Sequence, residues 1–186
     1  MTSATSYCGL VVTASVPDPQ AAPGALEQVR ELLNSWLIPN DTREPTDRFD
    51  DLARRRRWAP QEAAIARELR DDLRAAVDGG SRDLEFLNGW ISRLDVRPAV
   101  AGGELSYRHA AGPAGDLLAA VLAAVSDGTW LRLKTCPDCR WAFYDRTRNG
   151  SKRWCLMYAG GPNGRACGSI AKMRRYREKP SALGGA

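Results

Sequence analysis

Histidine, lysine and long hydrophobic runs are all scarce in this chain of 186 residues. His109 is the only histidine, so a single imidazole is available as the base for a cysteine nucleophile or as a ligand for a catalytic metal. No apolar run reaches the ~18–20 residues that a bilayer-spanning helix requires. The first six residues also lack the basic cluster that opens a signal peptide. We therefore expect a cytoplasmic protein with no membrane partner.

Cysteine is absent between residues 9 and 135, and this distribution is informative. One cysteine, Cys8, stands alone, and the other four fall in a single segment near the C-terminus. An odd and clustered set argues against a secreted disulfide scaffold and favours an intracellular metal site. For Cys8 the favoured interpretation is a small buried hydrophobic residue.

Charge is divided unevenly along the chain. Residues 132–179 contain thirteen Lys/Arg, including every lysine of the protein, and three Asp/Glu, which gives a net charge of +10. Because the whole chain carries +5, the remainder carries −5. This asymmetry predicts an end that binds a polyanion and a body that is acidic.

Hydrophobic periodicity predicts a mainly α fold with a small β component. Apolar residues recur at helical spacing between proline and glycine stops in four segments, Gly24–Leu37, Pro60–Asp78, Leu84–Leu94 and Pro113–Val125. Another helix end is expected at Phe49–Trp58, whose run Arg54–Arg57 is interpreted as a solvated surface among acidic neighbours. Residues 39–51 are expected to form a polar loop, and residues 96–109 a β-hairpin.

The helical part offers few groups for chemistry. Tyr107 and His109, on the second strand of the expected hairpin, are the candidates for a ligand pocket, together with Arg54–Arg57. A histidine at a strand end is more often a satisfied surface residue than a ligand. No residue is therefore assigned as catalytic, and the enzyme question stays open with the balance against an enzyme.

The segment Trp130–Lys134 is expected to be a strand that runs directly into the first clustered cysteine. With no flexible linker between them, the cysteine segment should be docked on the body. The expected organisation is a helical domain over residues 1–131, a four-cysteine finger with a basic terminal helix over 132–179, and a disordered tail over 180–186.

The cysteine spacing predicts a structural site for Zn²⁺. Cys136 and Cys139 form a C-x-x-C pair whose thiolates converge from one turn, and fifteen residues separate Cys139 from Cys155, as in a zinc-ribbon excursion. We expect a hairpin there, with strands at 141–144 and 153–154 joined by Asn-Gly. Cys155 and Cys167 complete four ligands, which leaves no open position for a catalytic water. Unliganded cysteines and redox chemistry at the C-x-x-C pair are the alternatives.

Cationic side chains surround this zinc frame and continue into a basic terminal helix. Such a surface can neutralise several phosphates of a nucleic acid. The alternative is a solvated helix, or one that docks on the acidic body. The expected nucleic-acid contacts are Arg146, Arg148, Lys152, Arg153, Lys172, Arg174, Arg175, Arg177 and Lys179.

The stretch CPDCRWAFYDRTRNGSKRWCLM, residues 136–157, strongly resembles the CGNR-type zinc finger. The order of elements over residues 24–134 is similar to the helical ABATE domain that precedes the finger in that family. The resemblance implies a treble-clef or ribbon-like finger with four cysteine ligands. It also implies a bacterial transcription regulator, in which the finger binds DNA and the helical domain responds to stress or a ligand.

Two departures from the family pattern stand out. The name-giving Cys-Gly-Asn-Arg reads here Cys167-Gly168-Ser169-Ile170, and the stretch 158–166 lengthens the interval between the last two cysteines. The favoured function is a DNA-binding zinc-finger regulator with a helical domain for sensing or dimerisation. One alternative is a repurposed member that acts as an enzyme or binds a small molecule in its helical domain. Another is an RNA- or tRNA-binding module. A small-molecule effector and a homodimer are left open as partners.

Overall fold

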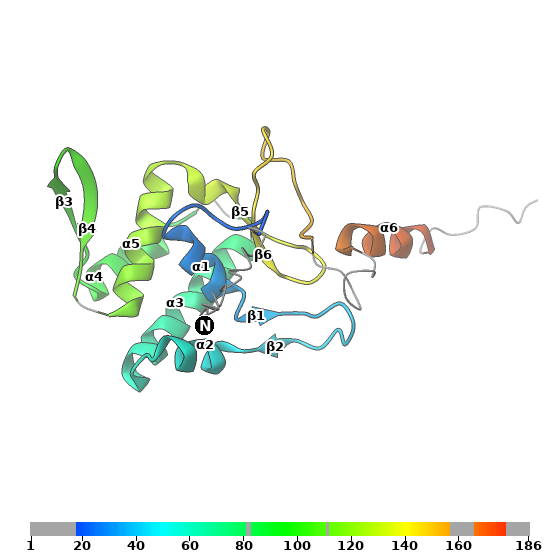
Figure 1. Ribbon diagram of the computed structural model, residues 1–186, viewed down its shortest axis with the longest axis horizontal. Coiled ribbons are helices and arrows are strands. Elements are labelled where there is room, and N and C mark those ends of the chain that lie inside the picture. Colours follow the sequence, from blue (N-terminus) through cyan, green and yellow to red (C-terminus); the bar gives the residue numbers. More distant parts are fainter. Residues whose placement is uncertain (1–17, 81–82, 111, 157–165, 178–186) are drawn as a thin grey trace, which may run out of the picture.

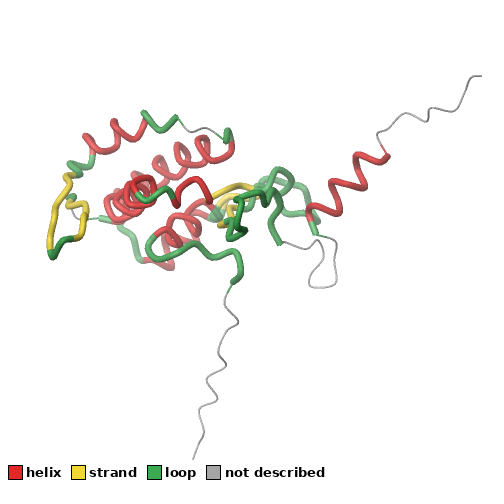
Figure 2. The backbone as a smooth tube through the Cα atoms, turned by 90° about the horizontal axis from the view of Figure 1, so that it is seen from above, coloured by secondary structure: helices red, strands yellow, loops and turns green. Residues whose placement is uncertain are grey.

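The computed structural model describes residues 18–80, 83–110, 112–156 and 166–177. A mainly helical body leads into the cysteine segment, and a last helix projects from that segment (Figures 1 and 2). Cys8, Lys179 and the tail 180–186 lie outside these ranges, so what the sequence predicts for them stays a prediction. Within these ranges, no helix has both the length and the apolar character to cross a membrane.

The body alternates helices with short strands. In chain order it contains α1 (Leu26–Leu33), β1 (Trp36–Leu37), β2 (Thr46–Asp47), α2 (Phe49–Arg56), α3 (Pro60–Asp78), α4 (Phe86–Arg93), β3 (Arg97–Ala101), β4 (Glu104–Arg108) and α5 (Pro113–Ser126). The C-terminal part contains the 3-10 helix η1 (Thr129–Arg132), β5 (Leu133–Thr135), β6 (Ala142–Tyr144) and α6 (Cys167–Arg177). The described strands form three antiparallel pairs, β1–β2, β3–β4 and β5–β6. The predicted mainly α fold with a small β component is confirmed.

The hydrophobic core lies where α5 packs against both α1 and α3. Leu118 and Val121 of α5 and Leu69 and Leu73 of α3 are completely buried. Helix α3 starts at Pro60, where the missing N–H costs no hydrogen bond. The Glu62 carboxylate accepts a hydrogen bond from the N–H of Ala59, the residue before the helix. The expected helix over Pro60–Asp78 is therefore confirmed, with the cause that the sequence suggested.

The predicted helix Gly24–Leu37 is wrong at its C-terminal end. Helix α1 stops at Leu33, because the Ser35 hydroxyl donates a hydrogen bond to the Leu32 carbonyl and competes with the helical pattern. The chain then turns into β1, which pairs with β2. The predicted polar loop 39–51 is thus wrong in part, since a small hairpin occupies residues 36–47; we refer to it as the β1–β2 hairpin.

Two arginines of α3 are buried and hold this hairpin to the body. Arg70 donates two hydrogen bonds to the Asp47 carboxylate, at 2.7 and 2.9 Å. Arg74 donates to the carbonyls of Leu33 and Trp36, at 2.7 and 3.0 Å, and its guanidinium stacks on the Trp36 ring. Burial lowers the pKa of Arg74, and the Asp78 carboxylate opposes that effect. These contacts explain why strands form where composition indicates a loop.

The predicted strand Trp130–Lys134 is correct only in its second half. Residues 129–132 form η1, and β5 begins at Leu133. The predicted hairpin over 141–154 is also wrong in its pairing. Strand β6 pairs backward with β5, so that Thr135 lies opposite Ala142 and the C-x-x-C turn closes the hairpin. No strand forms at 153–154.

Candidate metal centre

The four clustered cysteines converge on one buried point, although they come from three places in the chain. Cys136 and Cys139 lie in the β5–β6 turn, Cys155 follows a long loop, and Cys167 is the first residue of α6. Their sulfur atoms all lie within 4.8 Å of one another, and none of the four residues is more than 2% exposed. Zn–S bonds of ~2.3 Å place the sulfurs of a tetrahedral site about 3.8 Å apart. The observed cluster therefore has the dimensions of such a site.

The turn between β5 and β6 shapes the first half of the site. The Cys136 N–H donates to the Trp141 carbonyl, and the Arg140 N–H donates to the Cys136 carbonyl, both at 2.9 Å. Arg140 adopts a left-handed backbone conformation with φ of 60°. This tight turn points both thiols of the C-x-x-C pair inward.

Aromatic side chains enclose the second half of the site. Phe143 is fully buried against the cysteines, and Trp141 and Trp154 pack around them. A Cβ atom on Gly168 would lie 3.2 Å from the Trp154 ring, so the glycine after the last cysteine lets Trp154 approach the start of α6. Gly168 is thus retained for packing although the two residues after it depart from the family pattern.

Hydrogen bonds among the four thiols ease the loss of a proton from Cys136. The pKa of Cys136 lies well below its usual range, because Cys139 and then Cys155 and Cys167 donate hydrogen bonds to its thiolate. Four thiolates together repel one another, and a divalent cation removes that repulsion while replacing the protons. Four sulfur ligands with no nearby imidazole or water position suit structural Zn²⁺.

The β1–β2 hairpin of the body reaches the metal centre. Asn40 Nδ2 donates a hydrogen bond to the sulfur of Cys167 at 2.9 Å, and the Ile38 N–H donates to the Cys139 carbonyl at 2.8 Å. Arg43 contacts the buried carboxylate of Asp138 inside the C-x-x-C turn at 3.4 Å. No local sequence pattern predicts a role for these residues at the metal centre. The only available signal was a polar Asn-Asp-Thr-Arg run, and nothing in that run indicates a partner so far along the chain.

A buried carboxylate organises the loop between β6 and Cys155. Asp145 is completely buried and accepts hydrogen bonds from Lys134 Nζ at 2.8 Å, from the Thr147 N–H and hydroxyl, and from the Lys152 N–H. Burial alone raises the pKa of Asp145, but these donors outweigh it and hold the pKa well below its usual range. The loop folds around this charge, which explains why the expected return strand does not form.

The described members of the expected nucleic-acid contacts fall into three groups. Two of the arginines have protein partners, since Arg146 donates to the Ala21 carbonyl at 2.9 Å and Arg174 pairs with Asp138 at 3.1 Å. Lys152 is half-buried with its ammonium 5.8 Å from the centre of the Phe143 ring. The remaining described cations are exposed and have no side-chain hydrogen bond or ion pair among the described residues, namely Arg148, Arg153, Lys172, Arg175 and Arg177.

The expected ligand-pocket residues are explained by local contacts. The Nδ1 atom of His109 lies 2.7 Å from the Ala110 carbonyl, and its Nε2 lies 3.4 Å from Asp116. A Cβ on Gly115 would lie 2.2 Å from His109 Nδ1, so the imidazole rests directly on the backbone of α5. Tyr107 packs against the hydrophobic core. The structure thus gives both residues a packing role.

The arginine run on α2 is a surface feature. Arg54 pairs with Asp51 at 2.9 Å, and Arg56 pairs with Glu31 of α1. Both pairs are substantially solvent-exposed. These contacts agree with the interpretation of a solvated helix end.

A mainly helical body joined to a buried cluster of four cysteines defines a zinc-finger protein in which the metal is structural. Comparison with protein families places the C-terminal part in one family, since residues 132–180 match the model of the CGNR zinc finger. This part of the chain is therefore a CGNR zinc finger, and the suspected family is confirmed there. A search of curated proteins finds no match to the chain.

Proposed function

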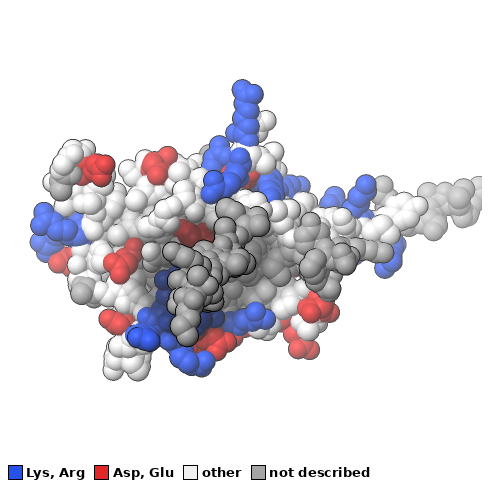
Figure 3. Space-filling view, in the orientation of Figure 1, with Lys and Arg blue, Asp and Glu red and all other residues white. Residues whose placement is uncertain are grey.

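We propose that the protein binds nucleic acid through its zinc finger and α6, with duplex DNA as the target, and acts as a transcription regulator. The observation that carries the proposal is the concentration of exposed cations on the zinc-ordered segment. Seven exposed Lys/Arg side chains lie on the loop after β6 and on α6, and five of them have no side-chain partner among the described residues, whereas the rest of the chain is net negative. Figure 3 shows cations on the upper loop and along the projecting helix.

The shape of α6 supports a duplex as the target. The helix has 11 residues and projects away from the body (Figure 1). At 1.5 Å per residue it is about 16 Å long, and a single helix fits the major groove of B-DNA. Zinc bound to Cys167 would fix the start of this helix, and Arg174 pairs with Asp138 of the C-x-x-C turn. The metal centre thereby orients the cations that would contact phosphates.

The helical body would supply control in this proposal, as a sensor or a dimerisation element. Its support is the physical connection between the two parts. Asn40 contacts the metal ligand Cys167, and Arg74 donates to the Arg140 carbonyl at 3.2 Å. A conformational change in the body would therefore alter the position of Cys167 and of the C-x-x-C turn in the finger.

Binding to nucleic acid is tested by fluorescence anisotropy with the zinc-loaded full chain and a mixed-sequence 25-base-pair duplex. If these five cations without a side-chain partner contact phosphates, the logarithm of the association constant falls with the logarithm of salt concentration with a slope of about −4.5. The double variant Lys172→Gln/Arg175→Gln should weaken binding and make the slope shallower by about 2. A slope near zero for the native protein would overturn the proposal.

The matched control is Arg54→Gln/Arg55→Gln, which removes the same charge from exposed positions of α2. This control should leave the slope unchanged, and an equal effect of both double variants would reduce the interaction to overall charge. An RNA hairpin and a single strand of the same sequence test the alternative target. Tighter binding to the RNA hairpin or to the single strand than to the duplex would rule out duplex DNA as the target.

A further inference from the structure

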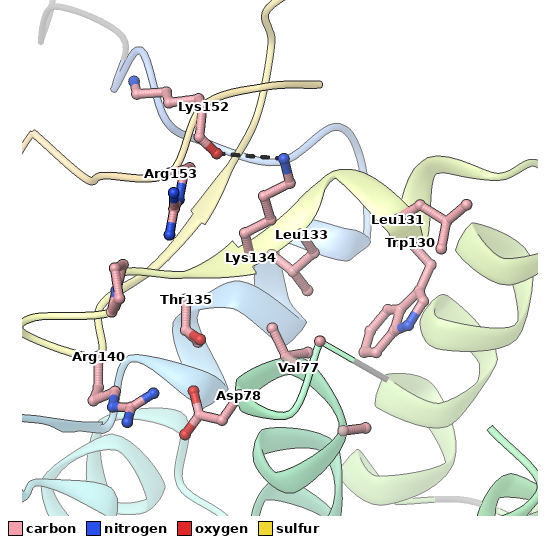
Figure 4. Close-up of a pocket in the computed structure, with 13 residues that line it drawn as sticks. Val77, Asp78, Trp130, Leu131, Leu133, Lys134, Thr135, Arg140, Lys152 and Arg153 are labelled. Atoms are coloured by element: carbon pink, nitrogen blue, oxygen red, sulfur yellow. Dashed lines mark hydrogen bonds between the residues drawn. The ribbon is translucent and has the colours of Figure 1, made fainter. Parts of the chain in front are cut away.

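A hollow lies at the seam between the body and the finger, and none of the four cysteines lines it. It is bounded by the C-terminal end of α3, by η1 and β5, and by the C-x-x-C turn with residues 152–153 (Figure 4). Its volume is about 410 Å³, within the range of ~300–1,000 Å³ that small-molecule sites occupy. Nothing in the metal centre uses this space.

The wall formed by the body is apolar. Val77, Trp130 and Leu133 line it, and the latter two are almost completely buried. Figure 4 shows Val77, Leu133 and the Trp130 ring on one side of the hollow. Val77 is half-buried, so a flat hydrocarbon group resting there would cover the apolar surface that Val77 leaves in water.

The wall formed by the finger is cationic. Arg140 and Arg153 line it, and within the described ranges neither guanidinium has a hydrogen bond or an ion pair. Lys134 also lines the hollow, but its ammonium is already bound by Asp145 and by the carbonyls of Gly150 and Lys152. Two arginines are therefore available for an anion, and arginine binds planar carboxylates and phosphates through paired donors.

One acceptor completes the lining. Asp78, at the end of α3, faces Arg140 across the lower part of the hollow in Figure 4. Its Oδ2 accepts a hydrogen bond from Arg74 at 3.4 Å, whereas its buried Oδ1 has no hydrogen-bond partner among the described residues. A buried acceptor without a partner carries a desolvation cost that an N–H or O–H group of a ligand would relieve.

We propose that this seam hollow, defined by Val77, Asp78, Trp130, Leu133, Arg140 and Arg153, binds a small organic anion with a flat apolar body. The anionic group pairs with Arg140 and Arg153, and the apolar body packs on Val77, Trp130 and Leu133. Such a ligand touches α3 and the finger at once, so its binding stabilises their docked arrangement. A nucleic-acid backbone fits this lining less well, because it has phosphates for the arginines but would leave the apolar wall uncovered.

The test uses the zinc-loaded full chain and 2-naphthoate as the probe, with 2-naphthamide as its neutral counterpart and inorganic phosphate as an anion without an apolar body. Isothermal titration should show that naphthoate binds at least tenfold more tightly than either comparison compound. In a ¹H–¹⁵N NMR titration the amides of Val77 and Thr135 should shift. Binding of naphthoate that is no tighter than that of naphthamide, or shifts confined to other regions, would overturn the proposal.

The side chain of Arg140 provides a clean variant. Its contacts within the protein are made by backbone atoms, since its N–H donates to the Cys136 carbonyl and its carbonyl accepts from Arg74. Arg140→Gln should therefore keep the zinc content and the thermal midpoint while weakening naphthoate binding by about tenfold, the effect of one charge-assisted hydrogen bond. Arg55→Gln is the control and should change nothing. Unchanged naphthoate affinity in Arg140→Gln would refute the site.

Duplex binding separates this site from the nucleic-acid surface. Arg153 lines the hollow and is also one of the proposed phosphate contacts, whereas Arg140 is not, so Arg140→Gln should leave the affinity for the 25-base-pair duplex within twofold of the native value. An equal loss of duplex and naphthoate binding would assign the hollow to the nucleic-acid surface instead. Failure of the native protein to bind duplex, with naphthoate binding intact, would sink the proposed function and leave this inference standing.

Discussion

Replacement of Asn40 by alanine tests whether the body and the metal centre form one unit. The Asn40 amide donates to the Cys167 sulfur at 2.9 Å from the β1–β2 hairpin. A thiolate ligand that accepts an N–H hydrogen bond carries less uncompensated charge and is held in a fixed direction. Asn40→Ala removes that donor and leaves the four zinc ligands in place.

Two estimates of the effect agree. Loss of an outer hydrogen bond to a metal ligand typically lowers metal affinity by ~10–100-fold, which corresponds to about 1.4–2.7 kcal/mol. Independently, one hydrogen bond to a charged acceptor contributes ~1.5–3 kcal/mol. We therefore expect Asn40→Ala to weaken zinc binding by about 10–100-fold. Asn40→Asp should be worse, because it places a carboxylate against a thiolate.

Zinc affinity is measured by competition with a chromogenic chelator at pH 7.4, with the full chain. The matched control is Asn88→Ala, since Asn88 is an exposed residue of α4. This control should bind zinc like the native protein. A change of less than twofold in Asn40→Ala would refute the idea that the β1–β2 hairpin supports the metal centre, and so would equal losses in both variants.

Three further outcomes are expected. Chelation of zinc should abolish the near-ultraviolet circular dichroism of the Trp141 and Trp154 rings, which pack around the cysteines. Most of the far-ultraviolet helical signal should persist, because the helical body has its own hydrophobic core. Retention of the full near-ultraviolet spectrum without metal would contradict a structural zinc site. Asp145→Asn should lower the free energy of unfolding by about 3 kcal/mol, because it leaves the partly buried Lys134 ammonium without its carboxylate partner. The pKa of Asp145 is depressed in the folded protein, so its contribution to the free energy of unfolding is fully present above the unfolded pKa of ~3.9 and is lost only as pH falls towards the folded pKa. The difference in unfolding free energy between the native protein and Asp145→Asn should therefore be constant from pH 8 to pH 5.5. A decline in that window would be evidence against a buried, ionised Asp145. Gly115→Ala should destabilise by about 1–3 kcal/mol through its clash with His109, and His109→Ala should suppress most of that loss in the double variant, as thermal denaturation would reveal.

Local signals in the sequence were sufficient for the helices and for the type of metal site. The apolar stripe of α3 and its Pro60 start specify a helix without help from distant residues. The C-x-x-C pair and the distances to Cys155 and Cys167 indicate a thiolate site, because thiol chemistry and turn geometry are both local or nearly so. The confirmed mainly α fold and four-cysteine zinc site rest on features of this kind.

Contacts between distant residues could not be predicted in the same way. Arg70 and Arg74 follow Leu69 and Leu73 on α3, and composition alone assigns such arginines to the surface. They are buried because their partners, Asp47 and the carbonyl groups after α1, are supplied by tertiary folding. The β1–β2 hairpin depends on those partners, and for that reason the local sequence predicts a loop there.

The loop after β6 illustrates the same limit at shorter range. Asn149-Gly150 favours a hairpin turn, and the backbone does turn there. The return strand is absent because Asp145 collects donors from Lys134, Thr147 and Lys152. A pattern of turn residues cannot show that a buried carboxylate competes with the strand for the same backbone groups.

The order of residues along the chain gives the Asn40–Cys167 contact a consequence for biosynthesis. The two residues are 127 positions apart, so at ~5–20 residues per second the ribosome adds Asn40 about 6–25 s before Cys167. The β1–β2 hairpin can fold within that interval, since elementary folding events take microseconds to milliseconds. The last cysteine then meets a finished surface that already presents its hydrogen-bond donor. Until that moment the nascent chain holds Cys136, Cys139 and Cys155 as an incomplete set of thiols, which makes the interval before Cys167 arrives the period when oxidation or capture of a wrong metal is easiest.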